Sequence, residues 1–151
     1  MYISAKADYG LRALLALAAA GGETLKGEAV AESQHLPVKF VENILVDLRR
    51  AGFVKAQRGL AGGYRLARSA DEISLAAVIR ALEGPLAEVR GLRPDQVVYD
   101  GPAEHLQEVW IAVRASLRGV LEQITIADVL AGRFPRSVAK LIDDPDAWQV
   151  R

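Results

Sequence analysis

The feature that most limits the possible folds is a change of periodicity after Gly52. Residues 37–51 carry apolar side chains at helical spacing, whereas residues 53–57 and 64–66 alternate as strands do, on either side of a six-residue loop, 58–63. The stripe that the helix is expected to bury consists of Val41, Ile44, Leu45 and Leu48. An amphipathic helix followed directly by a glycine-rich hairpin predicts a winged helix-turn-helix.

Two more helices are expected before this unit. The first covers about residues 5–20, and its apolar repeat consists of Leu11, Leu14, Leu15 and Ala18. Thr24 is a candidate cap for a short second helix that runs to about Ser33, and residues 34–37 form a tight break in which His35 suits a left-handed backbone. Two helices, a short turn and a third helix with a polar outer face complete the pattern.

Charge is balanced over the whole chain and concentrated in one part of it. The 151 residues contain 19 Lys and Arg against 19 Asp and Glu, which argues against a non-specific nucleic-acid coat. Between Lys39 and Arg68, however, seven basic residues stand against two acids, a local net charge of +5. In and beside the wing, Arg58, Arg65 and Arg68 add charge that suits phosphates, so this region is the candidate nucleic-acid surface.

The second half of the chain is expected to be helical around one loop. Ser74 can cap a fourth helix that ends at Gly84-Pro85, and residues 86–101 lack periodicity. Gly101-Pro102 opens the longest helix, whose broad apolar stripe is Leu106, Val109, Trp110, Val113, Leu117, Val120, Leu121 and Ile124. A stripe of this breadth on a helix set apart from the winged domain fits pairing with a second copy of the chain.

The predicted organisation has four parts. Residues 1–85 form the winged helix-turn-helix domain, 86–101 a loop, 102–131 the dimerisation helix with a short helix, and 132–151 a loosely ordered tail. A capping box starting at Thr125 is expected to begin the short helix. The fold class is therefore mainly α with a small β-hairpin.

Several function classes lack their residues. The chain has no cysteine, so it can form no disulfide, thiolate metal site or Cys-held iron–sulfur cluster, and its two histidines, His35 and His105, fit no metal spacing. No cofactor and no metal is therefore expected. Motifs of phosphate loops and serine hydrolases are missing, which argues against an enzyme. No segment resembles a membrane span or signal peptide, so a cytoplasmic location is expected.

Three ordered segments resemble one family of bacterial winged-helix regulators, which includes IscR, NsrR and CymR. They are YISAKADYGLRALLALA at residues 2–18, the wing RGLAGGYRLAR and IRALEGPL at residues 79–86, and the likeness extends to about residue 131. The resemblance implies a homodimeric transcription regulator, usually a repressor, that binds a dyad-symmetric operator in double-stranded DNA. It also implies that helix 37–51 enters the major groove and wing loop 58–63 the minor groove.

The resemblance also assigns individual roles. Glu42 stands where relatives read a cytosine, and Arg58 matches the wing arginine of the minor groove, chemistry that suits a carboxylate and a guanidinium. The DNA-binding residues expected on this basis are Lys39, Phe40, Glu42, Asn43, Arg58, Gly59, Gly62, Gly63 and Tyr64. Those expected at the dimer interface are Leu106, Val109, Trp110, Val113, Leu117, Val120 and Leu121.

Departures from the family pattern concern sensing. Many relatives hold an iron–sulfur cluster with three cysteines after the LEGP segment, whereas this chain is closest to the cluster-free CymR-like branch. Asp8, which matches a cluster ligand of some relatives, is four residues before Arg12 and is expected to pair with it. A small molecule bound near residues 86–101 and a partner metabolic enzyme are alternative effectors. A winged helix that binds protein instead of DNA is the alternative function.

Overall fold

The computed structural model describes residues 3–150. Within this range lie seven α-helices, four short 3₁₀ helices and one antiparallel hairpin. The elements are α1 (Ala5–Ala19), α2 (Gly27–Gln34), α3 (Val38–Arg50), β1 (Val54–Gln57), β2 (Gly63–Leu66), η1 (Ala70–Glu72), α4 (Leu75–Glu83), η2 (Pro94–Gln96), η3 (Gly101–Ala103), α5 (Leu106–Leu121), α6 (Ile126–Ala131), α7 (Arg136–Ile142) and η4 (Pro145–Trp148). The mainly helical class with one small hairpin is confirmed.

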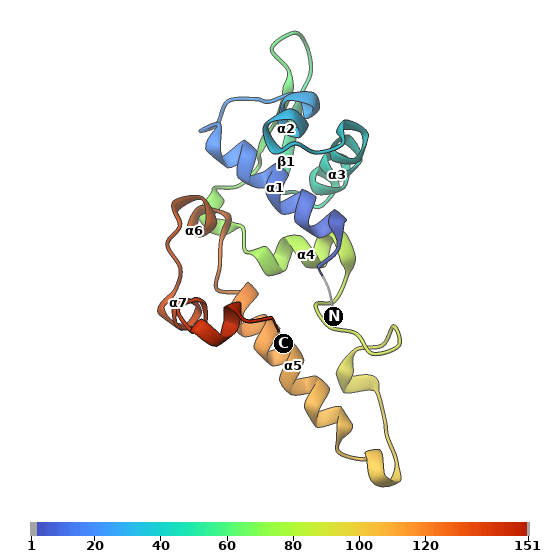
Figure 1. Ribbon diagram of the computed structural model, residues 1–151. Helices are drawn as coiled ribbons and strands as arrows, with labels where there is room; N and C mark the ends of the chain where they lie inside the picture. Colours follow the sequence, from blue (N-terminus) through green and yellow to red (C-terminus); the bar gives the residue numbers. More distant parts are fainter. Residues whose placement is uncertain (1–2, 151) are drawn as a thin grey trace.

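Helix α1 is the centre of the winged domain. It contacts α2, α3, α4, α6 and β2, so it is covered on several sides (Figure 1). The apolar repeat predicted for this helix is only partly right. Leu14 is fully buried, but Leu11 and Leu15 are half-buried, while Ala13 and Leu17 lie in the core. Neighbours on several sides bury more than one stripe, so the helix needs small residues as well as leucines.

The turn between α2 and α3 has the predicted geometry. His35 ends α2 with φ 52° and ψ 47°, a left-handed conformation that histidine adopts more readily than most residues. Pro37 then precedes α3 and offers no side-chain cap. The four residues of the predicted stripe of α3, Val41, Ile44, Leu45 and Leu48, are all buried.

The hairpin is fixed to the loop between α1 and α2. Strands β1 and β2 pair from Val54 opposite Leu66 to Gln57 opposite Gly63. Beyond this ladder, Leu25 and Tyr64 exchange backbone hydrogen bonds of 2.9 and 2.7 Å. The Thr24 hydroxyl donates to the carbonyl of Ala61 at 2.9 Å, so the prediction that Thr24 caps α2 is wrong.

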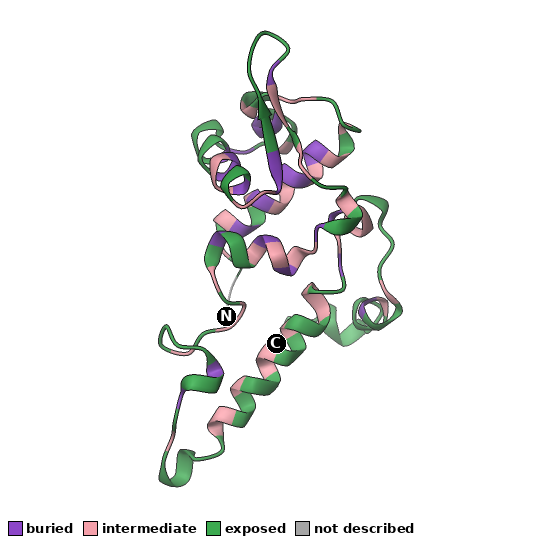
Figure 2. Cartoon of the chain, turned by 180° about the vertical axis from the view of Figure 1, so that it is seen from behind, coloured by how far each residue is buried: buried purple, intermediate pink, exposed green. Residues whose placement is uncertain are grey.

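Helix α5 extends away from the winged domain (Figures 1 and 2). Residue 84 ends α4, as predicted, and the chain then passes through η2 and η3 before α5 begins at Leu106. No residue of α5 is buried, although the helix carries many apolar side chains. Figure 2 shows α5 as alternating exposed and half-buried positions.

After α5 the chain returns to the winged domain. Leu75 donates its backbone N–H to the carbonyl of Ile124 at 2.9 Å, and Ile126 donates to Ile73 at 2.9 Å. Ile124 therefore does not continue the stripe of α5, which ends at Leu121. The predicted organisation placed the short helix α6 with the long helix, but α6 packs against α1. The predicted capping box is confirmed, since the Asp128 backbone N–H donates to the Thr125 hydroxyl at 3.1 Å and the Thr125 backbone N–H donates to the Asp128 carboxylate at 2.8 Å. The bonds from the Thr125 backbone N–H and then from its hydroxyl lower the pKa of the Asp128 carboxyl.

The C-terminal segment is more regular than the sequence predicted. Residues 136–142 form α7, in which Val138 is buried, and the Ser137 hydroxyl donates to the Gln123 side chain at 2.9 Å. The expected loosely ordered tail is therefore wrong for this stretch. Among residues 3–150, no helix combines the length and apolar character needed to cross a lipid bilayer.

Candidate nucleic-acid interface

Four side chains predicted to contact DNA share the open face of α3. Because α3 buries Val41, Ile44, Leu45 and Leu48, the helical repeat turns the intervening positions outward. The exposed residues are Lys39, Phe40, Glu42 and Asn43. Phe40 is 53% exposed, and its ring meets that of Tyr9 edge to face at 6.1 Å between centroids. A large exposed aromatic group next to polar side chains suits contact with bases.

The two acids of this basic region have different surroundings. Asp47 forms an ion pair of 2.8 Å with Lys6 and a longer one of 3.8 Å with Arg50. Glu42 has no ion-pair partner among residues 3–150, and a Cβ at Gly27 would lie 3.2 Å from its Cγ. The stem of Glu42 therefore lies over the start of α2, and its carboxylate is available to an external hydrogen-bond donor.

The wing residues divide into an exposed group and a supporting group. Arg58 and Gly59 are exposed, whereas Gly62 is buried, and Gly63 and Tyr64 are half-buried where β2 meets Leu25. Leu60, which the sequence analysis did not select, is fully exposed in the loop. The sequence does contain an indication of this role, because Leu60 is an apolar residue between glycine and alanine at the wing tip. Architectural proteins insert apolar side chains of this type between bases.

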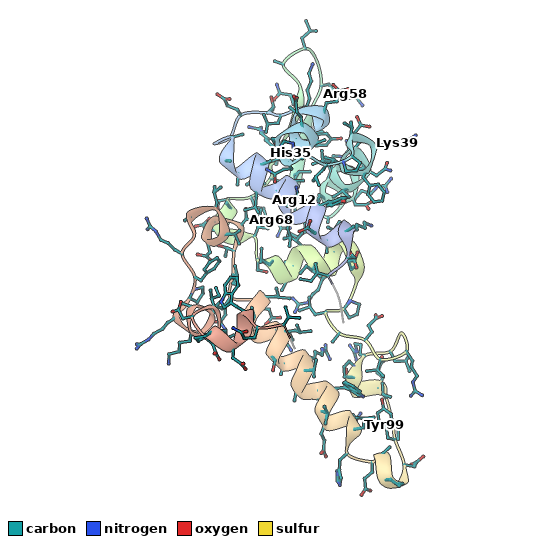
Figure 3. All side chains as sticks on the ribbon, viewed as in Figure 1. Arg12, His35, Lys39, Arg58, Arg68 and Tyr99 are labelled. Atoms are coloured by element: carbon teal, nitrogen blue, oxygen red, sulfur yellow. The ribbon has the colours of Figure 1, made fainter. Side chains whose placement is uncertain are left out.

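Arg68 lies apart from Lys39 and Arg58 (Figure 3). Its guanidinium lies over the ring of Phe53, 5.1 Å from the centroid, and Figure 3 places it at the base of the hairpin. Arg68 is exposed, and its expected role toward phosphates stays a prediction. Figure 3 shows Lys39 and Arg58 at the same end of the molecule, away from α5.

The ion pair expected in α1 is present and supports the helix-turn-helix. Arg12 contacts Asp8 at 3.3 Å, and its guanidinium also donates to the carbonyl of Gln34 at the end of α2. Arg12 thereby ties α1 to the turn that leads into α3, and Asp8 holds Arg12 in place. Asp8 thus has a structural partner in this chain.

An apolar groove runs between α4 and α5. Its volume is about 720 Å³. Its walls are Ile3, Ser4, Ile79, Glu83, Leu86, Val109, Ala112, Val113, Ser116, Leu117, Val120 and Leu121. Five of the seven predicted interface residues are among them, but Leu106 and Trp110 are not. The Trp110 indole instead donates to the Tyr99 hydroxyl at 3.0 Å and turns toward the loop.

Comparison with known proteins gives a consistent set of relatives. A family model described as "Rrf2: Iron-dependent Transcriptional regulator" matches residues 3–132. A Mycobacterium tuberculosis protein, named as a candidate HTH-type transcriptional regulator, is 47% identical over 145 residues, covering 95% of this chain and 90% of the relative. The HTH-type transcriptional regulator CymR of Bacillus subtilis is 36% identical over 132 residues, covering 85% and 89%.

Solved structures agree with these sequence matches. The structure of B. subtilis CymR, described as the global cysteine regulator, has a TM-score of 0.74 at 32% identity and covers 87% of this chain and 98% of that one. The T. potens IscR structure has a TM-score of 0.68 at 31% identity and covers 100% and 93%. The resemblance to IscR and CymR seen in the sequence is confirmed, and the relatives are regulators, not enzymes.

The iron named in the family description does not fit the residues of this chain. Iron–sulfur clusters are held mainly by cysteine thiolates, and the sequence contains none. In the part of the chain that the structure describes, no three His, Asp or Glu side chains are grouped so that they could hold a metal ion. A cluster-based sensor is therefore incompatible with the donor set.

We expect the protein purified without oxygen to be colourless. Added iron and sulfide should leave its DNA affinity unchanged, because no thiolate can take up a cluster. Metal analysis, absorption spectra and DNA titrations with and without iron and sulfide check this. Stoichiometric iron together with acid-labile sulfide in the purified protein would contradict it.

Proposed function

Because this chain belongs to the Rrf2 family of transcriptional regulators, we propose that it is a homodimeric repressor that reads a dyad-symmetric operator. The observation that carries the proposal is the joint exposure of α3 and the wing loop at one end of the molecule (Figure 3). Helix α3 is held by its buried apolar stripe and the wing by the backbone pairing of Tyr64 with Leu25, and the outer sides of both offer polar and cationic groups. This is the arrangement that DNA recognition by a winged helix requires.

In this proposal α3 lies in the major groove. Glu42 accepts a hydrogen bond from the exocyclic amine of a cytosine, a role suited to a carboxylate that has no cationic partner among residues 3–150. Phe40 contacts thymine methyl groups through its exposed ring, while Lys39 and Asn43 contribute polar contacts.

The wing loop enters the minor groove. Arg58 provides a guanidinium, which a narrow minor groove attracts, and Gly59 lets the loop approach the backbone closely. Gly63 and Tyr64 act indirectly, since they hold β2 against Leu25. Gly62 also acts indirectly, because its backbone N–H donates to the carbonyl of Gly59 at 3.0 Å and closes the loop. The hydrogen bond from Thr24 to Ala61 supports the same loop, so the wing is positioned before DNA binds.

A second copy of the chain occupies the apolar groove between α4 and α5. The support is the unburied apolar face of α5, in particular Val113, Leu117 and Val120. Pairing of two such faces places two copies of α3 on successive turns of the duplex, as a dyad-symmetric operator needs. In this proposal a dimer bound at such a site blocks RNA polymerase, so the regulation is repression.

Arg58→Ala tests the minor-groove role. The variant should bind specific and random duplex DNA more weakly, and the slope of log K against log salt should fall by about one. DNA titrations at several salt concentrations measure both effects. Arg133→Ala, a matched loss of charge beyond α6, is the control and should leave the slope unchanged.

Glu42→Ala tests base reading by α3. Removing a carboxylate near phosphates should leave random-DNA affinity equal or slightly higher, while operator affinity falls by about 1–3 kcal/mol at one base pair per half-site. If Glu42→Ala and Arg58→Ala each reduced the affinities for random DNA and for operator DNA in the same proportion, Glu42 would not be reading a base. A wild-type protein that shows no salt-dependent retention on heparin or random duplex would support the protein-binding alternative instead.

A further inference from the structure

Four arginines surround a hollow at the junction of the winged domain and α5. Arg80 comes from α4, Arg93 from the segment before η2, and Arg114 and Arg118 from successive turns of α5. Gly84, Pro85 and Leu86 complete the wall, and the volume is about 340 Å³. A hollow of this size is in the range of small-molecule sites.

Two carboxylates hold these arginines from outside the hollow. Asp95 contacts Arg93 and Arg114, each at 2.9 Å. Glu122 contacts Arg118 at 3.0 Å and also pairs with Arg80. Neither carboxylate is part of the hollow's wall, so the charged groups that line it are all cationic.

The charges of this cluster do not cancel. Each carboxylate is shared by two guanidinium groups, so four positive charges face two negative ones. Hydrogen bonds from Arg80 and then Arg118 hold the pKa of the Glu122 carboxyl below its ordinary value, so Glu122 stays ionised at neutral pH. The cluster therefore keeps a net charge of +2, which can attract an anionic ligand.

We propose that this hollow binds a small dianion, a compound that carries a phosphate group or two carboxylates. Guanidinium groups recognise both through paired N–H donors, and the bonds to Asp95 and Glu122 limit the movement of the four arginines before a ligand arrives. Binding of such an anion does not require DNA.

The position of the hollow gives the ligand a regulatory role, which rests on the proposed function. Arg80 belongs to the helix that packs on α1, whereas Arg114 and Arg118 belong to the proposed dimerisation helix. A ligand that bridges them favours one orientation of the winged domain relative to α5. Because the spacing of the two α3 helices depends on that orientation, occupancy changes operator affinity.

Calorimetric titration of the full-length protein without DNA tests the site. Inorganic phosphate and malonate, each at constant ionic strength against a chloride control, distinguish phosphate from dicarboxylate recognition. We expect one saturable site per chain for at least one of the two anions. No saturable heat from either anion would overturn the proposal, and would be the result if the second copy of the chain filled the hollow.

Variants distinguish a specific anion-binding site from general electrostatic attraction of anions. Arg114→Gln combined with Arg118→Gln should weaken anion binding about tenfold or more, since each removes charged hydrogen bonds. Arg133→Gln combined with Arg136→Gln makes the same change of charge outside the hollow and should bind as the wild type. Arg118→Lys keeps the charge but loses the paired donors, and should fall between them. Equal losses in the two double variants would overturn the site.

A second measurement tests the regulatory step. A saturating concentration of the better anion should shift the affinity of the wild type for an operator selected in vitro, and should not shift that of the Arg114→Gln, Arg118→Gln variant. Saturable anion binding without any shift would overturn the regulatory role. Failure of the protein to bind DNA both without and with the anion would instead refute the proposed function and leave the calorimetric result standing.

Discussion

Replacing Val113 and Leu117 together by glutamate is expected to convert the protein to monomers. Both side chains line the apolar groove between α4 and α5, and in the proposed dimer each chain would bury two charges without partners. The cost is several kcal/mol per chain, on the order of the stability of a protein interface. Sedimentation or light scattering would then give the mass of one chain.

DNA binding by this variant should fall with the dimer. One winged domain alone loses the second half-site, so operator affinity should decrease by about 10²–10⁴-fold. Ile111→Glu combined with Ala115→Glu is the matched control, because these exposed positions lie on α5 outside the groove. A Val113→Glu, Leu117→Glu variant that keeps the wild-type mass would show that another surface forms the dimer.

Gly63→Ala is expected to detach the wing from its support. Gly63 has φ 149°, and a Cβ at this position would lie 2.5 Å from the carbonyl oxygen of Leu25. Because the obstacle is backbone that pairs with Tyr64, it cannot move without breaking the bridge. The cost is about 2–4 kcal/mol, from strain and steric overlap. The melting temperature should fall by about 5–10 °C.

The same substitution should weaken DNA binding although Gly63 itself does not contact DNA in the proposal. The wing would no longer be positioned in advance, and ordering it would cost binding free energy. Gly119→Ala in α5 is the control, since no atom other than its chain neighbours and the nearby backbone of its own helix lies within 4 Å of the new methyl group, and alanine favours a helix. Unchanged melting and DNA affinity in Gly63→Ala would contradict the bridge as the support of the wing.

Features determined by neighbouring residues could be predicted from the sequence. The structure contains the apolar stripe of α3 and the left-handed backbone of His35. It also contains the side-chain cap at Ser74 and the capping box at Thr125. Each depends on side chains within a few positions of one another, and periodicity and capping chemistry report such local interactions well.

Features determined by distant residues could not be predicted in the same way. Thr24 resembles a helix cap, but its hydroxyl bonds to Ala61, 37 positions later. Ile124 continues the apolar spacing of α5, yet its carbonyl pairs with Leu75 in the winged domain. The hollow with its four arginines is of the same kind, because its members lie between positions 80 and 118 and meet only after folding.

The return of the chain from α5 to the winged domain has an evolutionary consequence. The stretch from Gly84 to Ile124 leaves and rejoins one body at two fixed points, since α4 packs on α1 and residues 124–126 pair with residues 73–75. The entropy of closing such an excursion grows slowly with its length. Insertions, deletions and new ligand-binding residues can therefore accumulate between these two points while the winged domain keeps its fold. Proteins that share this DNA-binding domain can thereby come to respond to different signals in different lineages.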